Sequence, residues 1–109
     1  MKFDEYQELA YVTANKNLTF NEALCNWSMG LSGEAGEFIE LLKKQIFHSK
    51  QANRDQLVKE LGDILWYLAN AALCLGISLQ EIADTNIAKL KARYPEGFVD
   101  WHSRTDKEK

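Results

Sequence analysis

The sequence predicts an all-α fold, a four-helix bundle-like domain that is homo-oligomeric. Three features of its 109 residues lead to this prediction. Apolar residues recur at helical spacing, the single proline, Pro95, stands near the C-terminus, and four segments begin with the residue pair of a capping box. A chain of this length holds one core of modest size, so further apolar burial between copies is expected.

Each predicted helix begins at a capping signal, where a side chain accepts a hydrogen bond from an exposed backbone amide. The helices are expected over 4–15, 20–46, 54–75 and 79–94, starting at the pairs Asp4 and Gln7, Thr19 and Glu22, Asn53 and Gln56, and Ser78 and Glu81. Gly76 is suited to end the third helix in a left-handed conformation, and Pro95 with Gly97 is expected to end the fourth. The domain therefore spans 1–98, and a polar C-terminal tail over 99–109 is expected to fray from Ser103 onward.

Two of these helices carry a continuous apolar stripe, which indicates the face that each turns toward the core. In the second helix the stripe is Leu24, Leu31, Ala35, Phe38 and Leu42, and in the third it is Leu57, Leu61, Ile64, Leu65, Leu68, Ala72 and Leu75. Trp66 points away from the second of these stripes, so we expect it to contact another copy of the chain.

The composition excludes several classes of protein. The net charge of −3 and the pI of about 5.4 leave no basic field to attract nucleic acid. Cys25 and Cys74 form neither a disulfide framework nor a CxxC motif, which suits a reducing cytoplasm. The longest nearly apolar stretch, 64–77, is interrupted by Asn70 and is too short to cross a membrane. We therefore expect a cytoplasmic protein without nucleic-acid or membrane partners.

An internal similarity connects the second and third helices. Segments 31–42 and 57–68 align without a gap, and the alignment superposes two acid pairs, Glu34 on Glu60 and Glu37 on Asp63. The two acids of each pair lie within about 60° of each other on one helix face. If the helices form an antiparallel hairpin, the two pairs come together.

Four converging carboxylates repel one another unless a cation compensates their charge. Oxygen ligands favour Mg²⁺, with Mn²⁺ as a substitute. Single acid pairs on helices are usually solvated charge, and Glu40, farther round the second helix, is interpreted in that way. A di-iron centre is excluded because it needs Glu-x-x-His on two helices, whereas His48 follows Gln45 and His102 follows Val99 at that spacing.

Three motifs resemble those of the MazG-type all-α nucleoside triphosphate pyrophosphohydrolases. They are GLSGEAGEFIELLKK at 30–44, KELGDILWYLA at 59–69 and NIAKLKARYPEGF at 86–98. The likeness extends from Phe3 to Phe98 and implies a homodimer or dimer of dimers with Mg²⁺ in each site. It also implies hydrolysis of an NTP or dNTP to NMP and pyrophosphate, as in nucleotide-pool clean-up.

The resemblance implies roles for particular residues. The metal ligands and catalytic acids would be Glu34, Glu37, Glu60 and Asp63, one of which would orient or deprotonate the attacking water. Candidate substrate-binding residues are Tyr67, four residues after Asp63, and a polar group on one face of the fourth helix, Asn86, Lys89 and Arg93. Two alternatives stay open: a phosphoribosyl-ATP pyrophosphohydrolase, which shares this helical family, and a non-catalytic helical dimerisation module. The preferred base and sugar are not indicated.

Overall fold

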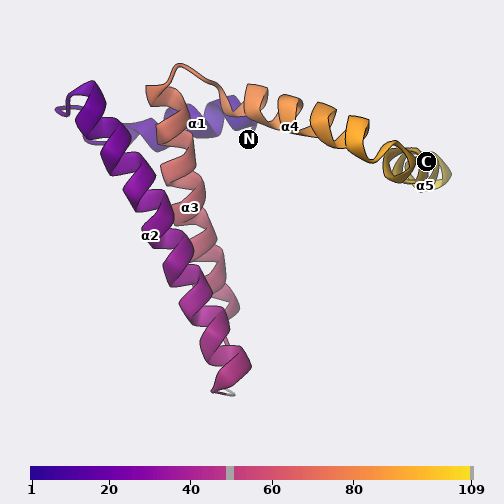
Figure 1. Cartoon of the computed structure of the whole chain (residues 1–109), viewed down its shortest axis with the longest axis horizontal. Helices are drawn as coiled ribbons and strands as arrows, with labels where there is room; N and C mark the ends of the chain where they lie inside the picture. Colours follow the sequence, from indigo (N-terminus) through magenta and orange to yellow (C-terminus); the bar gives the residue numbers. More distant parts are fainter. Residues whose placement is uncertain (49–50, 109) are drawn as a thin grey trace.

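The structure is a computed structural model that describes residues 1–48 and 51–108, with side chains as far as Trp101. Over these residues the chain forms the helices α1 (Phe3–Val12), α2 (Phe20–Phe47), α3 (Arg54–Cys74), α4 (Leu79–Arg93) and α5 (Pro95–Glu108). Helices α2 and α3 form a long antiparallel hairpin, α1 crosses the hairpin near its open end, and α4 leads away from it (Figure 1). The prediction of an all-α fold is confirmed.

Three of the four predicted caps are present. The Thr19 hydroxyl accepts from the Glu22 amide at 3.2 Å, and the Glu22 carboxylate accepts from the Thr19 amide at 3.0 Å, which completes a capping box. The side chains of Asn53 and Ser78 cap α3 and α4. Helix α1 lacks the predicted cap, because it begins at Phe3 and the N-cap residue is Lys2, whose side chain makes no capping hydrogen bond. Asp4 therefore lies inside the first turn, where an acidic side chain is also favourable.

Helix α3 ends at a sharp corner, as expected for Gly76. This glycine has φ +73°, and the amides of Gly76 and Ile77 donate to the carbonyls of Leu73 and Ala72 at 3.0 and 2.9 Å. These bonds make a Schellman motif, which satisfies the last carbonyls of the helix. Helices α3 and α4 consequently meet at a bend of 100°.

Buried Gln7 of α1 fixes this corner. Its side-chain amide donates to the carbonyls of Ala69 and Ile77 at 3.2 and 3.0 Å, and its side-chain oxygen accepts from the Leu79 amide at 3.2 Å. Three bonds from one side chain therefore connect α1 to the end of α3 and the start of α4. Each bond satisfies a buried or half-buried backbone group that would otherwise be costly.

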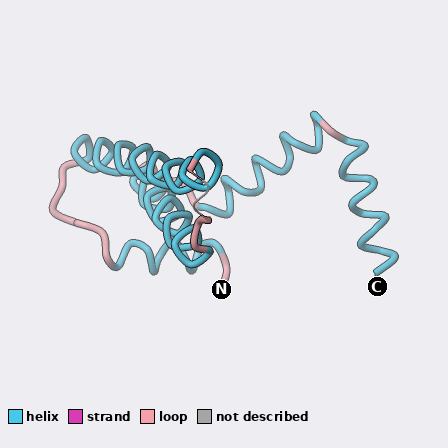
Figure 2. The backbone as a smooth tube through the Cα atoms, turned by 90° about the horizontal axis from the view of Figure 1, so that it is seen from below, coloured by secondary structure: helices cyan, strands magenta, loops and turns pink. Residues whose placement is uncertain are grey.

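The single chain departs from the predicted four-helix bundle. Helix α4 packs against α1 and α5 rather than along the hairpin, and α4 with α5 forms an arm that stands apart from it (Figure 2). The 100° corner prevents α4 from folding back. Within the described residues no single helix is long and apolar enough to cross a membrane, although the bent pair α3 and α4 together reach the required length and composition.

The C-terminal region was predicted incorrectly. Pro95 ends α4 as expected, but it also begins α5, because proline is well suited to the first position of a helix. The segment from Ser103 to Glu108, which we expected to fray, is helical. Lys109 lies outside the described residues, as do Ser49 and Lys50 in the connection between α2 and α3.

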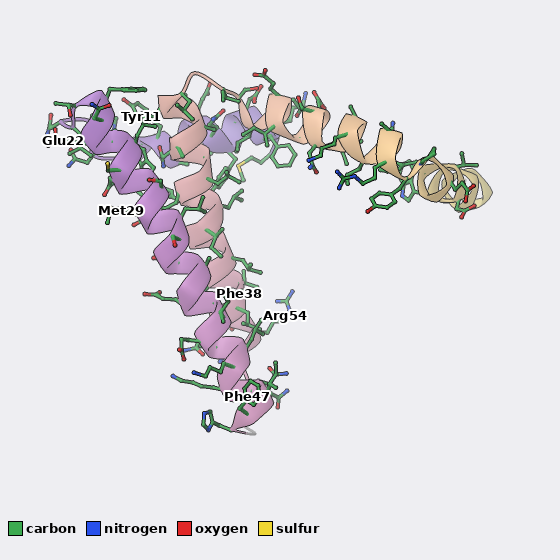
Figure 3. The ribbon with its side chains drawn as sticks, viewed as in Figure 1. Tyr11, Glu22, Met29, Phe38, Phe47 and Arg54 are labelled. Atoms are coloured by element: carbon green, nitrogen blue, oxygen red, sulfur yellow. The ribbon has the colours of Figure 1, made fainter. Side chains whose placement is uncertain are left out.

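The apolar core of the described chain is small. Its buried apolar side chains are Ala10, Ala14, Trp27, Ala69, Ala72 and Leu79. Leu61 and Leu75, both expected on the core stripe of the third helix, are 49% and 54% exposed among the described residues. Large apolar side chains are also exposed along α2, among them Met29 and Phe47 (Figure 3). The hairpin therefore keeps apolar surface that the single chain does not cover.

Trp66, for which we predict a contact with another copy, also makes contacts within its own chain. Its indole N–H donates to the Ala10 carbonyl at 3.0 Å and to the Thr13 hydroxyl at 2.9 Å. Its ring makes edge contacts with Trp27 and Tyr67, at centroid distances of 5.2 and 4.9 Å. Trp66 thus holds α1 against the hairpin of its own chain.

Candidate metal centre

The hairpin brings acids from both of its helices to one place. Glu34 and Glu37 of α2 and Glu60 of α3 each offer a carboxylate oxygen, and the three oxygens lie within 4.8 Å of one another. The side chains of Glu34 and Glu60 are half-buried, whereas Glu37 is exposed. The cluster therefore has a covered side between the helices and an open side toward solvent. Glu40, by contrast, is exposed and lies 4.0 Å from Lys43, as expected for solvated charge.

A close contact between Gly30 of α2 and Tyr67 of α3 fixes how the two helices are aligned along the hairpin. A Cβ atom added to Gly30 would overlap the Tyr67 ring, so only glycine permits this approach. Glu34 lies one turn after Gly30 and Asp63 one turn before Tyr67. Because the helices are antiparallel, both steps lead toward the same level of the hairpin.

The other glycines near the acids do not make close approaches within the chain. A Cβ atom added at Gly33, Gly36 or Gly62 would meet no atom of the described chain within 4 Å. Within the described residues, no neighbouring helix therefore approaches these three glycines closely. Their surfaces lie open beside the acidic cluster.

The electrostatics of the cluster disfavour a full set of negative charges. The pKa of Glu34 is raised from 4.5 to about 7, chiefly because the carboxyl group is withdrawn from water, and then because it hydrogen-bonds to Glu60. The like charges of Glu37, Asp63 and Glu60 raise this pKa further. Near neutral pH the Glu34 carboxyl is thus ready to exchange its proton for another positive charge.

The donor set fits a hard divalent cation. The Oε2 atoms of Glu34 and Glu60 are buried and receive no hydrogen bond from the described residues, which is costly for a carboxylate oxygen. Mg²⁺ binds oxygen at about 2.0–2.1 Å in octahedral geometry, so adjacent ligand oxygens stand about 3 Å apart and opposite ones about 4 Å. The three carboxylate oxygens, which lie within 4.8 Å of one another, would move closer together to share one such ion.

Asp63 lies beside the three-acid group rather than within it. It is exposed, but its charge contributes to the raised pKa of Glu34. It also raises the pKa of Tyr6 on α1, after the larger effect of burial on that hydroxyl. The sequence carried no sign of this interaction between Tyr6 and Asp63, since no spacing relates a residue of α1 to a residue of α3.

The predicted substrate-binding residues fall into two places. Tyr67 is half-buried in the hairpin, in the aromatic group with Trp27 and Trp66, one turn from Asp63. The remaining three lie exposed on the arm, where the bend at Gly76 carries them away from the acids of the same chain: Asn86, Lys89 and Arg93. The single chain does not bring these three residues to the cluster.

Comparison with protein families identifies one match. Residues 25–98 match the MazG nucleotide pyrophosphohydrolase domain, a range that contains all four acids. The chain is 41% identical over 83 residues to the Gene 37 protein of Mycobacterium phage L5, and the alignment covers 72% of each chain. That name states no activity. No solved structure matches the chain.

Proposed function

Because the chain belongs to the MazG nucleotide pyrophosphohydrolase family, we propose that it hydrolyses a nucleoside triphosphate to NMP and pyrophosphate in a Mg²⁺-dependent reaction. Water attacks the α-phosphorus, and pyrophosphate leaves with the electrons of the bond between the α- and β-phosphates. The observation that supports this proposal best is the convergence of Glu34, Glu37 and Glu60 from two helices. We further propose a cytoplasmic role in nucleotide-pool clean-up.

The exposure of each acidic side chain suggests which role it takes in the proposed reaction. Glu34, Glu37 and Glu60, with Asp63 beside them, would hold the cation, for which Mn²⁺ is the expected substitute. When bound, Mg²⁺ neutralises phosphate oxygens and lowers the pKa of a coordinated water. Half-buried Glu34 and Glu60 anchor the covered side of the site. Exposed Glu37 is open to solvent and is suited to orient the attacking water and accept its proton.

We propose that a second copy of the chain completes the bundle, as a homodimer or a dimer of dimers. The uncovered apolar surface of the hairpin supports this proposal, because such surface is stabilised by burial. In the assembly, Asn86, Lys89 and Arg93 of one copy would bind substrate phosphates at the acidic site of another. Mixing Glu37→Gln chains with Lys89→Ala chains should then restore part of the activity that each lacks alone, and no restoration would contradict sharing of the site.

Release of pyrophosphate from each common NTP and dNTP, with and without Mg²⁺, tests the proposed reaction. Phosphoribosyl-ATP belongs in the same panel, since preferential cleavage of that compound would favour the histidine-synthesis alternative. Glu37→Gln and Asp63→Asn should each lower kcat/KM by about 100-fold or more, whereas exposed Glu40→Gln should leave it unchanged. Release of phosphate instead of pyrophosphate would show that the assigned bond is wrong.

Calorimetric titration separates the enzyme from the non-catalytic module. The enzyme should bind Mg²⁺ together with a non-hydrolysable nucleotide. A dimerisation module whose acids are only solvated charge should bind neither.

A further inference from the structure

We propose that Gln7 is a positioning residue, which fixes the direction of α4 and thereby places Asn86 and Lys89 at the acidic site of a second copy. This inference rests on the proposed function and adds the contact that holds the arm in its working direction. Among the described residues, the hydrogen bonds of the Gln7 side chain go to the corner between α3 and α4 and not to the acids. Any effect of Gln7 on the site therefore passes through this corner.

The hydrogen bonds of Gln7 reach both sides of the corner. Its nitrogen donates to the carbonyl of Ala69, near the end of α3, and to that of Ile77, between the two helices. Its oxygen accepts from the amide of Leu79, which is the first residue of α4 and has no partner for this amide inside the helix. One side chain, only 5% exposed, therefore connects the start of α4 to both α1 and α3.

The other contacts of α4 with the hairpin side of the chain hold only its first turn. Leu79 belongs to the core cluster with Ala10 and Ala69, and it is the one buried residue of α4 among the described side chains. The outside of the turn is open, because a Cβ atom built on Gly76 would meet no described atom within 4 Å. The direction of the later turns of α4 therefore depends on the bonds at the corner.

The candidate phosphate-binding residues lie on the part of α4 that these bonds direct. A hollow of about 370 Å³ is lined by Ile77 of the corner and, farther along, by Asn86 and Lys89. Asn86 and Lys89 follow Leu79 by seven and ten residues, so they lie about 10 and 15 Å along the helix from its start. A change of angle at the corner consequently moves both side chains, whereas the acids of the hairpin stay in place.

The accessible surface of the chain supports action of the arm on a second copy. The chain exposes 8496 Å², whereas a folded monomer of 12.5 kDa exposes about 6,200 Å². The excess of about 2,300 Å² per chain is in the range that permanent dimers bury. Because α4 and α5 stand apart from the hairpin of their own chain (Figure 2), a partner that covers this surface lies within reach of the arm.

Mixed assemblies test which part of the site Gln7 serves. Gln7→Met, whose side chain has similar length but no amide, should raise KM for the nucleotide about tenfold or more and leave Mn²⁺ binding without nucleotide unchanged. Its acids are intact and its arm is misplaced, so mixing with Glu37→Gln chains should restore part of the activity. Mixing with Lys89→Ala chains should restore none, because both arms are then impaired. Gln80→Met, the same exchange at an exposed position of α4, should behave like the parent protein.

The opposite pattern would overturn the proposal. If Gln7 instead maintains the acids of its own chain, activity of Gln7→Met is restored by Lys89→Ala chains and not by Glu37→Gln chains. A Gln7→Met protein with the KM of the parent would also overturn it. Where Gln7→Met fails to fold, Gln7→Asn takes its place in both mixtures, since its side chain keeps the amide but is one methylene too short to make all three bonds.

Spin labels measure the direction of the arm without any catalysis. The labels are attached to Glu40→Cys on α2 and Ala92→Cys on α4, both at exposed positions, in a protein whose two native cysteines are replaced by serine. Labelled chains are diluted with unlabelled chains, so that each measured distance lies within one chain. Ala92 lies about 20 Å along α4 from Leu79, so a tilt of about 10° moves its label by about 3 Å.

The distribution of label distances should be narrow in the protein with Gln7 and in Gln80→Met. In Gln7→Met it should shift by about 3 Å or more, or become clearly broader. An unchanged distribution in Gln7→Met would show that Gln7 does not direct the arm. A changed distribution in a protein that releases no pyrophosphate would support the role of Gln7 in directing the arm and reject only the proposed reaction.

Discussion

Replacing Glu34 by glutamine should stabilise the metal-free protein. The pKa of Glu34 lies near 7 in the folded state against 4.5 as an isolated carboxyl, so folding becomes less favourable as pH rises through this range and the group loses its proton. Each tenfold change in the acid dissociation constant corresponds to about 1.4 kcal/mol, so the rise of the pKa from 4.5 to about 7 gives an upper limit of about 3.5 kcal/mol. Solvent screening at this half-buried side chain reduces the penalty to about 1–2 kcal/mol. Glutamine has no such charge, and it retains a group that can hydrogen-bond to Glu60.

Thermal unfolding at pH 8 and at pH 4.5 measures this effect. Without metal, Glu34→Gln should unfold about 4–8 °C above the parent protein at pH 8 and close to it at pH 4.5, where the parent carboxyl is protonated. Mn²⁺ at 100 times its Kd should stabilise the parent by about 2.7 kcal/mol and stabilise the variant much less. Glu40→Gln, the same exchange at an exposed position of α2, should match the parent throughout. A Glu34→Gln protein that is less stable at pH 8 and still stabilised by Mn²⁺ would refute the reasoning.

Further predictions concern the helix contacts and can be checked by chemical denaturation. Gly30→Ala should destabilise the protein by about 1–3 kcal/mol, because the added methyl overlaps the Tyr67 ring. The added methyl of Gly33→Ala meets nothing within 4 Å, so this variant should instead stabilise the protein by up to about 1 kcal/mol. Equal changes in the free energy of unfolding for Gly30→Ala and Gly33→Ala would contradict the packing described here. Thr19→Ala should cost about 1 kcal/mol through loss of the α2 capping box. Gly76→Ala should cost about 1–2 kcal/mol, because φ is +73° there, and a neutral result would argue against the left-handed corner.

The features that the sequence predicted well depend on neighbours in the chain. Helix starts followed from capping residues such as Thr19, and the meeting of Glu34 with Glu60 followed from helical periodicity plus one antiparallel hairpin. The features it did not predict depend on long-range contacts. The direction of α4 is determined by the bonds of Gln7 to the corner, and the approach of Asp63 to Tyr6 by the docking of α1.

The contacts of Trp66 within its own chain were not predicted for a related reason. Helical periodicity shows which side of α3 Trp66 occupies but not which helix covers that side, and the covering helix is α1 of the same chain. Capping patterns likewise gave no sign that Pro95 would start a new helix as well as end one.

A small change of angle at the corner formed by Gln7 and Gly76 displaces the far end of α4 by a larger distance. Helix α4 is about 22 Å long at 1.5 Å per residue, so a tilt of about 10° at the corner displaces Arg93 by about 4 Å. Substitutions at Gln7 can therefore alter how far the arm reaches without altering any residue on it.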